Sequence, residues 1–332
     1  MDSLLNFELR QPATLQQAVA MLAREPGARL LAGGTDLIAN LRRGIERPAV
    51  LISLGRVAGF DAIVQGDGGL WLGSGVTLAR LALDSGVQRL FPAVAQAAQA
   101  VAGPSQRNAA TLGGNLCLDT RCVFYNQSDW WRAANDHCLK RGGSVCHVAP
   151  QGHSCSAAFS GDLAPALLAL GAEVELLSAR GSRRIALAGL YRDDGAAHLT
   201  LEPDELLLRA WLPLPPAGAV SGYRKGRIRG AMDFPLAGVA MALVSKPHGL
   251  SALRVALTGT NPQPLLLEGV DALLGRSVDA ELAAALGKLV RQQVSPARTT
   301  ATSSNYRRLL AAALAQRLLL DLAAASGAGA LA

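Results

Sequence analysis

Hydrophobic residues follow two different spacings along the chain, and each spacing predicts one kind of element. Apolar positions recur at helical spacing after Thr14, which can cap a helix over 15–23 that Pro26 and Gly27 would end. Short apolar runs followed by glycine, at 30–32 and 49–54, predict buried strands. Further elements are predicted in the same way: a strand, a turn and a helix within 69–85, and helices at 36–44 and 92–102.

The second half of the chain continues this mixture. Apolar runs on either side of a turn at Gly181, within 166–191, predict strands, and prolines and glycines near 211–223 predict a domain boundary. Beyond it we predict an antiparallel pair of strands at 236–245 and 251–260, and helices at 278–294 and 304–325. The predicted class is therefore α+β, with domains over 1–215 and 220–328 and a frayed tail over 329–332.

Composition and charge exclude several classes of protein. Half of the 332 residues are hydrophobic and 17% are charged, which excludes a disordered chain. The most apolar stretch, 309–325, is interrupted at helical spacing by polar residues, so no membrane segment is predicted. The start of the chain lacks the pattern of a secretory signal, so we expect a cytoplasmic protein with reduced thiols. The net charge of +7 is spread out, and no nucleic-acid-binding pattern accompanies it.

Two loops share one design, in which apolar residues precede Gly-Gly and a short polar side chain. They are "LLAGGTDL" at 30–37 and "ATLGGNL" at 110–116. Paired glycines bend the backbone sharply and leave amide N–H groups uncovered, so an anion can approach closely. A tight turn alone would explain one such loop, whereas two matching loops suggest a diphosphate held from both sides. The Rossmann fingerprint and the P-loop are both absent.

Four of the five cysteines fall within 122–155, in a segment that also holds two of the four tryptophans. Gaps of 15, 7 and 8 residues separate Cys122, Cys138, Cys146 and Cys155, and these gaps match neither a ferredoxin nor a zinc ribbon. The neighbouring basic side chains would suit an anionic metal cluster; they are Arg121, His137, Lys140, Arg141, His147 and His153. Four aromatic residues are predicted to shield the metal in a small core: Phe124, Tyr125, Trp130 and Trp131.

The four cysteines are also compatible with roles other than holding an iron cluster. Four thiolates can bind zinc, the three histidines are rival ligands, and the thiols can be unrelated buried side chains. Disulfides are disfavoured in a reducing compartment. Cys117, directly after the second glycine loop, is predicted to be a buried structural thiol.

Three segments, in order, resemble the flavin-binding subunit of the xanthine dehydrogenase family of molybdenum hydroxylases. They are "LLAGGTDL", "QRNAATLGGNL" and "SGDLAPALLALGAEVEL", and "AMDFPLAGVAMAL" extends the resemblance into the C-terminal domain. The resemblance implies an FAD-binding domain of two α/β subdomains over 1–215, followed by the smaller domain with an antiparallel sheet. It implies that the two loops enclose the FAD diphosphate through Leu31, Ala32, Gly33, Gly34, Thr35, Asp36, Leu37, Thr111, Gly113, Gly114 and Asn115.

The resemblance implies further roles at single positions. Asp162 would contact the adenosine end of FAD, and Thr77 would approach the isoalloxazine ring. Lys225, together with Arg229 and Asp233, would lie in a segment that covers the ring. No catalytic acid or base is expected on this chain, because substrate chemistry would occur on a partner subunit.

The insertion at 119–158 is similar to that of the 4-hydroxybenzoyl-CoA reductase branch of the family, whose β subunit carries a [4Fe–4S] cluster. This implies that Cys122, Cys138, Cys146 and Cys155 are cluster ligands in an inserted iron–sulfur lobe. It also implies an electron-transfer oxidoreductase subunit that receives electrons from ferredoxin. A [2Fe–2S] small subunit and a molybdenum-cofactor large subunit, in a dimer of heterotrimers, would remove the phenolic hydroxyl to give benzoyl-CoA.

Two alternatives are kept. The chain can be the FAD subunit of another molybdenum hydroxylase that delivers electrons to NAD or a quinone, or a scaffold whose cysteines hold zinc. A further hypothesis is that the basic residues of the insertion dock an acidic ferredoxin, because complementary charge speeds association.

Overall fold

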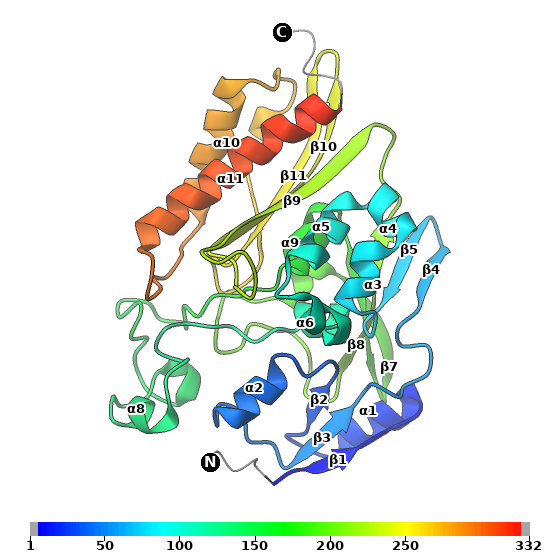
Figure 1. The fold of residues 1–332 in the computed structure, drawn as a ribbon, viewed down its shortest axis with the longest axis vertical. Helices are drawn as coiled ribbons and strands as arrows, with labels where there is room; N and C mark the ends of the chain where they lie inside the picture. The colour runs from blue at the N-terminus through cyan, green and yellow to red at the C-terminus, as the bar shows by residue number, and fades with distance from the viewer. Residues whose placement is uncertain (1–5, 327–332) are drawn as a thin grey trace.

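The computed structural model describes residues 6–326, and three sheets follow one another along the chain (Figure 1). The first is a parallel sheet of three short strands in the order β1-β3-β2. Its elements are β1 (Glu8–Arg10), α1 (Leu15–Arg24), β2 (Arg29–Leu31), α2 (Leu37–Arg42) and β3 (Val50–Ser53). Thr14 caps α1 as predicted, because its hydroxyl accepts a hydrogen bond from the Gln17 N–H at 3.2 Å.

The second sheet has five antiparallel strands in the order β4-β5-β8-β6-β7. The strands are β4 (Ile63–Gly66), β5 (Gly69–Gly73), β6 (Glu173–Ser178), β7 (Gly181–Ala186) and β8 (Leu206–Pro213). One face packs on helices and forms the largest core of the protein. These helical elements are α3 (Leu78–Leu83), α4 (Ser85–Leu90), α5 (Pro92–Ala100), α6 (Pro104–Ala109), α7 (Leu112–Leu116), α9 (Leu163–Ala169) and η2 (Leu187–Leu190). The FAD-binding domain was predicted to consist of two α/β subdomains. Only the first has parallel strands that alternate with helices, because the strands of the second sheet are antiparallel.

Helix α9 corrects one prediction from the sequence. The apolar residues at 166–169, which were predicted as strand, are the second half of this helix. Every residue of α9 is buried, so its sequence has no polar face to reveal a helical period. Pro165 lies in the first turn, where its missing N–H costs no hydrogen bond.

The third sheet is antiparallel, in the order β12-β11-β10-β9, and helices α10 and α11 cover one face (Figure 1). Its elements are β9 (Ala219–Gly226), β10 (Ala237–Lys246), β11 (Gly249–Thr258), β12 (Leu265–Leu266), η3 (Val270–Leu273), α10 (Ala280–Gln293) and α11 (Ser304–Ala325). Met241 packs toward α10 and α11, whereas Ala240 joins the core of α5 and α9. Burial of both faces explains why β10 has a nearly continuous apolar sequence.

The link between the second and third sheets is shorter than the predicted boundary segment. β8 extends to Pro213 and β9 begins at Ala219, so only 214–218 is irregular. The predicted tail at 329–332 lies outside the described residues. Within residues 6–326, no helix combines the length and apolar character needed to cross a membrane.

Residues 119–158 form a small lobe beside the main body, and α8 (Asp129–Ala133) and η1 (Leu139–Arg141) lie within it (Figure 1). Arg121 and Ala158 close its base by exchanging backbone hydrogen bonds of 2.9 and 2.8 Å. Phe124 and Tyr125 are buried in it as predicted, but Trp130 and Trp131 are 78% and 37% exposed, so the predicted four-aromatic core is wrong for both tryptophans.

The side chain of Arg132 is fully buried in the interior of the lobe. Its guanidinium donates to the carbonyl oxygens of Tyr125 at 2.8 Å and Gln127 at 2.6 Å. Backbone carbonyls that would otherwise lack partners therefore bind a cation inside the lobe.

We expect Arg307→Met to destabilise the protein by about 3 kcal/mol, because two buried carbonyl groups and one partly buried carbonyl group would lose their donor. Arg307 in α11 is 4% exposed and donates to Leu236, Gly259 and Ala297. Burial lowers the pKa of its guanidinium to about 10. Denaturant unfolding measures the change. Arg317→Met, on the exposed side of the same helix, is the control. An equal loss in the two variants would contradict this role.

Candidate functional site

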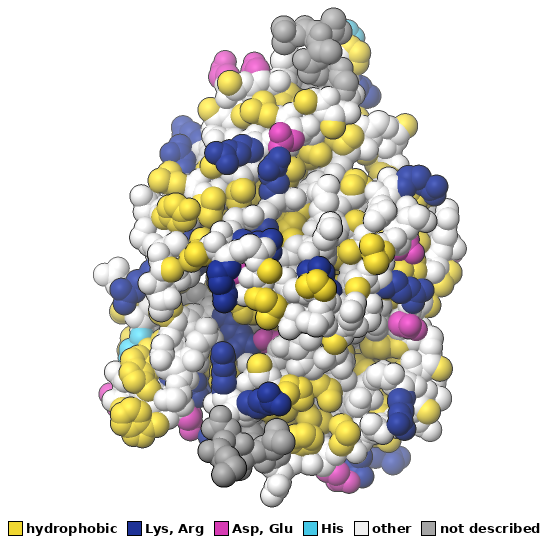
Figure 2. All heavy atoms as spheres, in the orientation of Figure 1, with side chains coloured by type: hydrophobic (Ala, Val, Ile, Leu, Met, Phe, Trp, Pro, Cys, Tyr) yellow, Lys and Arg dark blue, Asp and Glu magenta, His cyan; other side chains and the backbone are white. Residues whose placement is uncertain are grey.

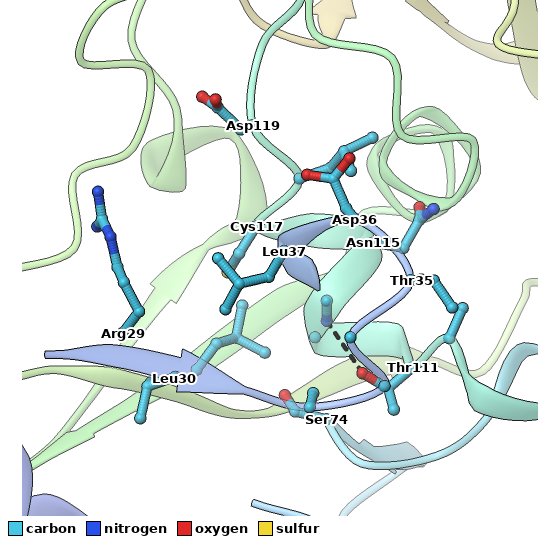
Figure 3. Close-up of a pocket in the computed structure, with 18 of the residues that line it drawn as sticks. Arg29, Leu30, Thr35, Asp36, Leu37, Ser74, Thr111, Asn115, Cys117 and Asp119 are labelled. Carbon is cyan, nitrogen blue, oxygen red and sulfur yellow. Dashed lines mark hydrogen bonds between the residues drawn. The ribbon is translucent and has the colours of Figure 1, made fainter. Parts of the chain in front are cut away.

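A cavity of about 630 Å³ lies where the first sheet, the second sheet and the base of the lobe meet (Figure 3). This volume is typical of ligand sites, which span about 300–1,000 Å³. Twelve of the predicted flavin-site residues line it: Ala32, Gly33, Gly34, Thr35, Asp36, Leu37, Thr111, Gly113, Gly114, Asn115, Asp162 and Lys225.

The first glycine loop joins β2 to α2. Gly34 has a φ of +69°, a backbone conformation that favours glycine. A Cβ on Gly33 would lie 1.8 Å from the carbonyl oxygen of Ala109, so this residue must be glycine for the two loops to meet. Within residues 6–326, the N–H groups of residues 33–36 donate no hydrogen bond. They form a run of free donors of the kind that binds phosphate groups.

The second glycine loop is held against the turn that follows β5. The Gly113 N–H donates to the Ser74 carbonyl at 2.9 Å, and a Cβ on Gly113 would lie 2.7 Å from the Ser74 Cβ. The Thr111 hydroxyl accepts from the Gly114 N–H at 3.1 Å and caps α7, an interaction drawn in Figure 3. Asn115 accepts from the Leu163 N–H at 2.9 Å and so ties this loop to α9.

Two predicted residues are close to the cavity but do not line it. Thr77 pairs with Thr111 through a β-bridge, and its hydroxyl caps α3 by accepting from the Arg80 N–H at 3.3 Å. Leu31 ends β2, immediately before the first loop. Both residues therefore position the loops in this structure.

Two buried polar atoms in the cavity wall lack a partner among the described residues: Asn40 Oδ1 and Ser74 Oγ. Buried polar groups without partners are rare, so these atoms are suited to a polar ligand. Together with the free N–H groups of the first loop, they fit the hydroxyl and diphosphate groups of FAD. Neither residue was predicted from the sequence. Ser74 lies in the "GSG" stretch, whereas Asn40 lies in a helix and had no distinctive sequence signal.

A buried group of three residues joins the two domains at the cavity. Asp162 accepts hydrogen bonds from Tyr223 at 2.5 Å and from Lys225 at 3.0 Å, and Lys225 also donates to the Ala100 carbonyl at 3.2 Å. Burial raises the pKa of Asp162, and the Lys225 ammonium opposes that rise. Asp162 and Lys225 thus meet at one point of the cavity wall, and their separate contacts with the two ends of FAD stay predictions.

The four cysteines of the insertion gather inside the lobe. Cys138, Cys146 and Cys155 are 4–6% exposed, and Cys122 is partly exposed. Burial raises the pKa of Cys122, and the neighbouring Cys138 and Cys146 raise it further. Burial raises the pKa of Cys155 to about 11, with contributions from Cys122 and Cys146. The raised pKa values favour the neutral thiol forms of Cys122 and Cys155 in the structure without a metal. Among residues 6–326, no three His, Cys, Asp or Glu side chains are arranged to hold a metal ion.

The histidines of the lobe have other surroundings. The ring of His147 stacks on Phe124 at 4.1 Å, and its Nε2 lies 2.5 Å from the His137 carbonyl oxygen. His153 is exposed to solvent. Cys117 lies apart from the other thiols in the cavity wall, where burial raises its pKa to about 12.

Two of the basic residues predicted to dock an acidic ferredoxin, Arg121 and Lys140, form ion pairs at the base of the lobe, whereas His153 is exposed. Lys140 pairs with Asp119 at 2.6 Å, Arg121 pairs with Asp36, and Arg132 is fully buried. The docking of ferredoxin stays a prediction. Figure 2 shows Lys and Arg side chains gathered in and around the hollow beside the lobe.

Known proteins with similar sequences cover nearly the whole chain. Residues 5–215 match the family described as the FAD binding domain in molybdopterin dehydrogenase, and residues 221–322 match the CO dehydrogenase flavoprotein C-terminal domain. The chain is 35% identical over 291 residues to the aldehyde oxidoreductase FAD-binding subunit PaoB of Escherichia coli K12, covering 82% of this chain and 87% of that protein. It is 29% identical over 318 residues to the xanthine dehydrogenase FAD-binding subunit of Escherichia coli O157:H7, covering 95% of each.

Solved structures show the same fold. A chain of quinoline 2-oxidoreductase from Pseudomonas putida 86 has a TM-score of 0.79 and 25% identity, covering 98% of this chain and 99% of that chain. A chain of carbon monoxide dehydrogenase from Hydrogenophaga pseudoflava has a TM-score of 0.79 and 24% identity, covering 97% and 98%. With the family match over residues 5–215 and the 35% identical relative, these findings show that the chain is an FAD-binding subunit of the molybdenum hydroxylase family.

Proposed function

We propose that this chain is an electron-transfer subunit that carries both FAD and a [4Fe–4S] cluster within a molybdenum hydroxylase complex. The observation that carries the flavin part of the proposal is the cavity between the two glycine loops. The cluster part is supported by the resemblance of the insertion and by the burial of Cys138, Cys146 and Cys155 in one small lobe, although the described residues hold no ready site for a single metal ion. A molybdenum-cofactor large subunit and a [2Fe–2S] small subunit are the proposed partners, in a dimer of heterotrimers.

The residues of this chain bind and orient the flavin in this proposal. Bound FAD exchanges electrons singly or in pairs, whereas an iron–sulfur cluster transfers one at a time. The N–H groups at 33–36 would bind the diphosphate, and Asn40 and Ser74 would bind other polar groups of the nucleotide. The tight contact of Gly33 with Ala109 keeps the two loops close enough to act on one ligand.

The lobe offers an environment that suits an anionic cluster. Three of its four cysteines are buried, and Tyr125 donates its backbone N–H to the sulfur of Cys122 at 3.2 Å. N–H donors and nearby cations stabilise the negative charge of thiolate ligands. Lys140 supplies such a charge, because its ammonium lowers the pKa of Cys155 against the larger effect of burial.

Two substrate classes are supported by different observations. The insertion resembles that of 4-hydroxybenzoyl-CoA reductases, which supports reductive dehydroxylation to benzoyl-CoA with ferredoxin as donor. The 35% identity to an aldehyde oxidoreductase subunit over 82% of the chain favours a second candidate, in which the complex oxidises an aldehyde and this subunit passes the electrons on to an acceptor such as NAD or a quinone. Both candidates assign the same role to the flavin cavity of this chain.

Gly33→Ala should abolish most flavin binding. The new Cβ would clash with the Ala109 carbonyl and separate the two loops, and overpacking of this kind costs about 1–3 kcal/mol, or about tenfold or more in affinity. The flavin absorbance per purified chain measures the loss. Gly66→Ala in β4 is the matched control, since nothing lies within 4 Å of its added Cβ. Full flavin content in Gly33→Ala would reject the role of this contact.

Cys138→Ser should lose most of the iron of the chain while FAD remains bound. A serine hydroxyl stays protonated at neutral pH and cannot replace the thiolate ligand. Iron per chain and the visible spectrum are the measurements, and Cys117→Ser is the control because Cys117 lies outside the thiol group. Unchanged iron in Cys138→Ser would reject the ligand assignment. A wild-type lobe that contains zinc and no iron would support the scaffold alternative.

The substrate is decided by assays on the purified native complex. An aldehyde oxidase or dehydrogenase should reduce an electron acceptor when supplied with aromatic or aliphatic aldehydes. A 4-hydroxybenzoyl-CoA reductase should form benzoyl-CoA from 4-hydroxybenzoyl-CoA with a low-potential donor. Activity in one assay and none in the other selects between the two candidates, and inactivity in both rejects both.

A further inference from the structure

Two carboxylates in the cavity wall need explanation if the cavity binds an anionic dinucleotide. Asp36 and Asp119 both line it, and a negative side chain near a diphosphate would weaken binding by charge repulsion. We propose that two lobe cations, Arg121 and Lys140, are positioning residues that neutralise these carboxylates and so allow FAD to bind. This inference rests on the proposed function, and it makes the lobe part of the flavin site.

Lys140 is buried between the lobe and the main body. Its side chain is 7% exposed, and its ammonium donates to Asp119 at 2.6 Å, to the Thr120 hydroxyl at 2.5 Å and to the Gly195 carbonyl at 3.0 Å. Burial alone would raise the pKa of Asp119, but the attraction and hydrogen bond of Lys140 bring that pKa below its usual value. Asp119 is therefore held in its ionised form beside a lobe cation that compensates its charge.

Arg121 compensates the charge of Asp36 at the first glycine loop, as Lys140 does for Asp119. Its side chain is 10% exposed and bonds Asp36, whose other oxygen accepts from Asn40 at 2.9 Å. Asp36 belongs to the run of residues whose N–H groups are free donors. The buried Nε of Arg121 has no partner within residues 6–326.

Acidic residues elsewhere in the cavity wall obtain their cations from the main body. The pairs are Glu46 with Arg29 at 3.0 Å, Glu205 with Arg183 at 2.7 Å, Asp162 with Lys225 at 3.0 Å and Asp233 with Arg229 at 3.3 Å. Glu202 is exposed, so solvent screens its charge. Asp36 and Asp119 thus differ from these residues, because their cations come from the insertion.

The contacts of Lys140 also link the flavin cavity to the thiol group. The Gly195 N–H donates to the Cys155 carbonyl at 2.7 Å, and Asp194 accepts from the Cys155 N–H at 3.1 Å. Lys140 donates to the carbonyl of the same Gly195, so one residue of the main body contacts both Lys140 and the backbone of Cys155. Asp119 lies where the chain enters the lobe and lines the cavity, so a displacement of the rest of the lobe, which carries Lys140, would separate the two side chains. Flavin affinity should then fall, and by thermodynamic reciprocity bound flavin should stabilise the docked lobe.

A double-mutant cycle on the full-length chain tests the proposal, with the dissociation constant of FAD measured by titrating flavin-free protein. Lys140→Met should weaken FAD binding by about tenfold, the scale of one uncompensated nearby charge. Asp119→Asn should bind FAD at least as tightly as wild type. The double variant should recover to within about threefold of wild type, because no uncompensated carboxylate remains. Arg121→Met should weaken binding in the same direction as Lys140→Met.

Arg47→Met is the matched control, since it removes a cation that pairs with the exposed Asp129 of the lobe at 3.5 Å and lies away from the cavity wall. A double variant as weak as Lys140→Met, or an equal loss in Arg47→Met, would overturn the proposal. If Lys140→Met does not fold, as judged by circular dichroism, weaker binding in Asp119→Asn alone would overturn it. A wild-type chain that binds no FAD would instead reject the proposed function.

Discussion

The close approach of the two glycine loops is the constraint on which the site depends. Gly33 lies against the backbone at Ala109, at a separation that leaves no room for a side chain. The first loop belongs to a parallel βαβαβ unit, whereas the second begins a helix in the core of an antiparallel sheet. Two separately built layers therefore make their tightest backbone approach at this glycine, beside a hydrophobic core in which Ala18 and Val19 of α1 pack near Leu206 of β8. The cavity lies next to this contact. Packing in each layer fixes its own loop, so the geometry between the loops is preorganised.

Electrostatics then determine what this space can hold. The cavity wall contains several carboxylates, most of them paired with arginine or lysine, so its charge is largely compensated. The remaining free donors are backbone N–H groups, which bind anions without carrying a full charge that would need a counterion. Arg121 and Lys140 belong to the lobe and pair with Asp36 and Asp119 of the cavity wall. The net charge of the cavity wall therefore depends on a segment that contributes to none of the three sheets.

Sequence patterns predicted elements that have a capping residue, a change of polarity between faces, or a length typical of one kind of element. Thr14 and the helix after it, and the paired strands near Ala240, were found because their boundaries or lengths are distinctive. Helix α9 was predicted wrongly at 166–169, because burial on all sides removes the period that identifies a helix. The glycine loops were identified from composition, but their mutual contact was not, since it joins residues far apart in the chain. For the same reason, no local pattern could foresee that Lys140 pairs with Asp119 or that Lys225 contacts Asp162.

The base of the lobe has an architectural consequence. The chain leaves the main body at Arg121 and returns beside it at Ala158, joined by a single two-bond bridge. The lobe contributes no strand to any of the three sheets, and its two ends lie side by side at the pair formed by Arg121 and Ala158. A segment attached in this way can be gained, lost or exchanged as a module while the scaffold beneath it keeps its shape.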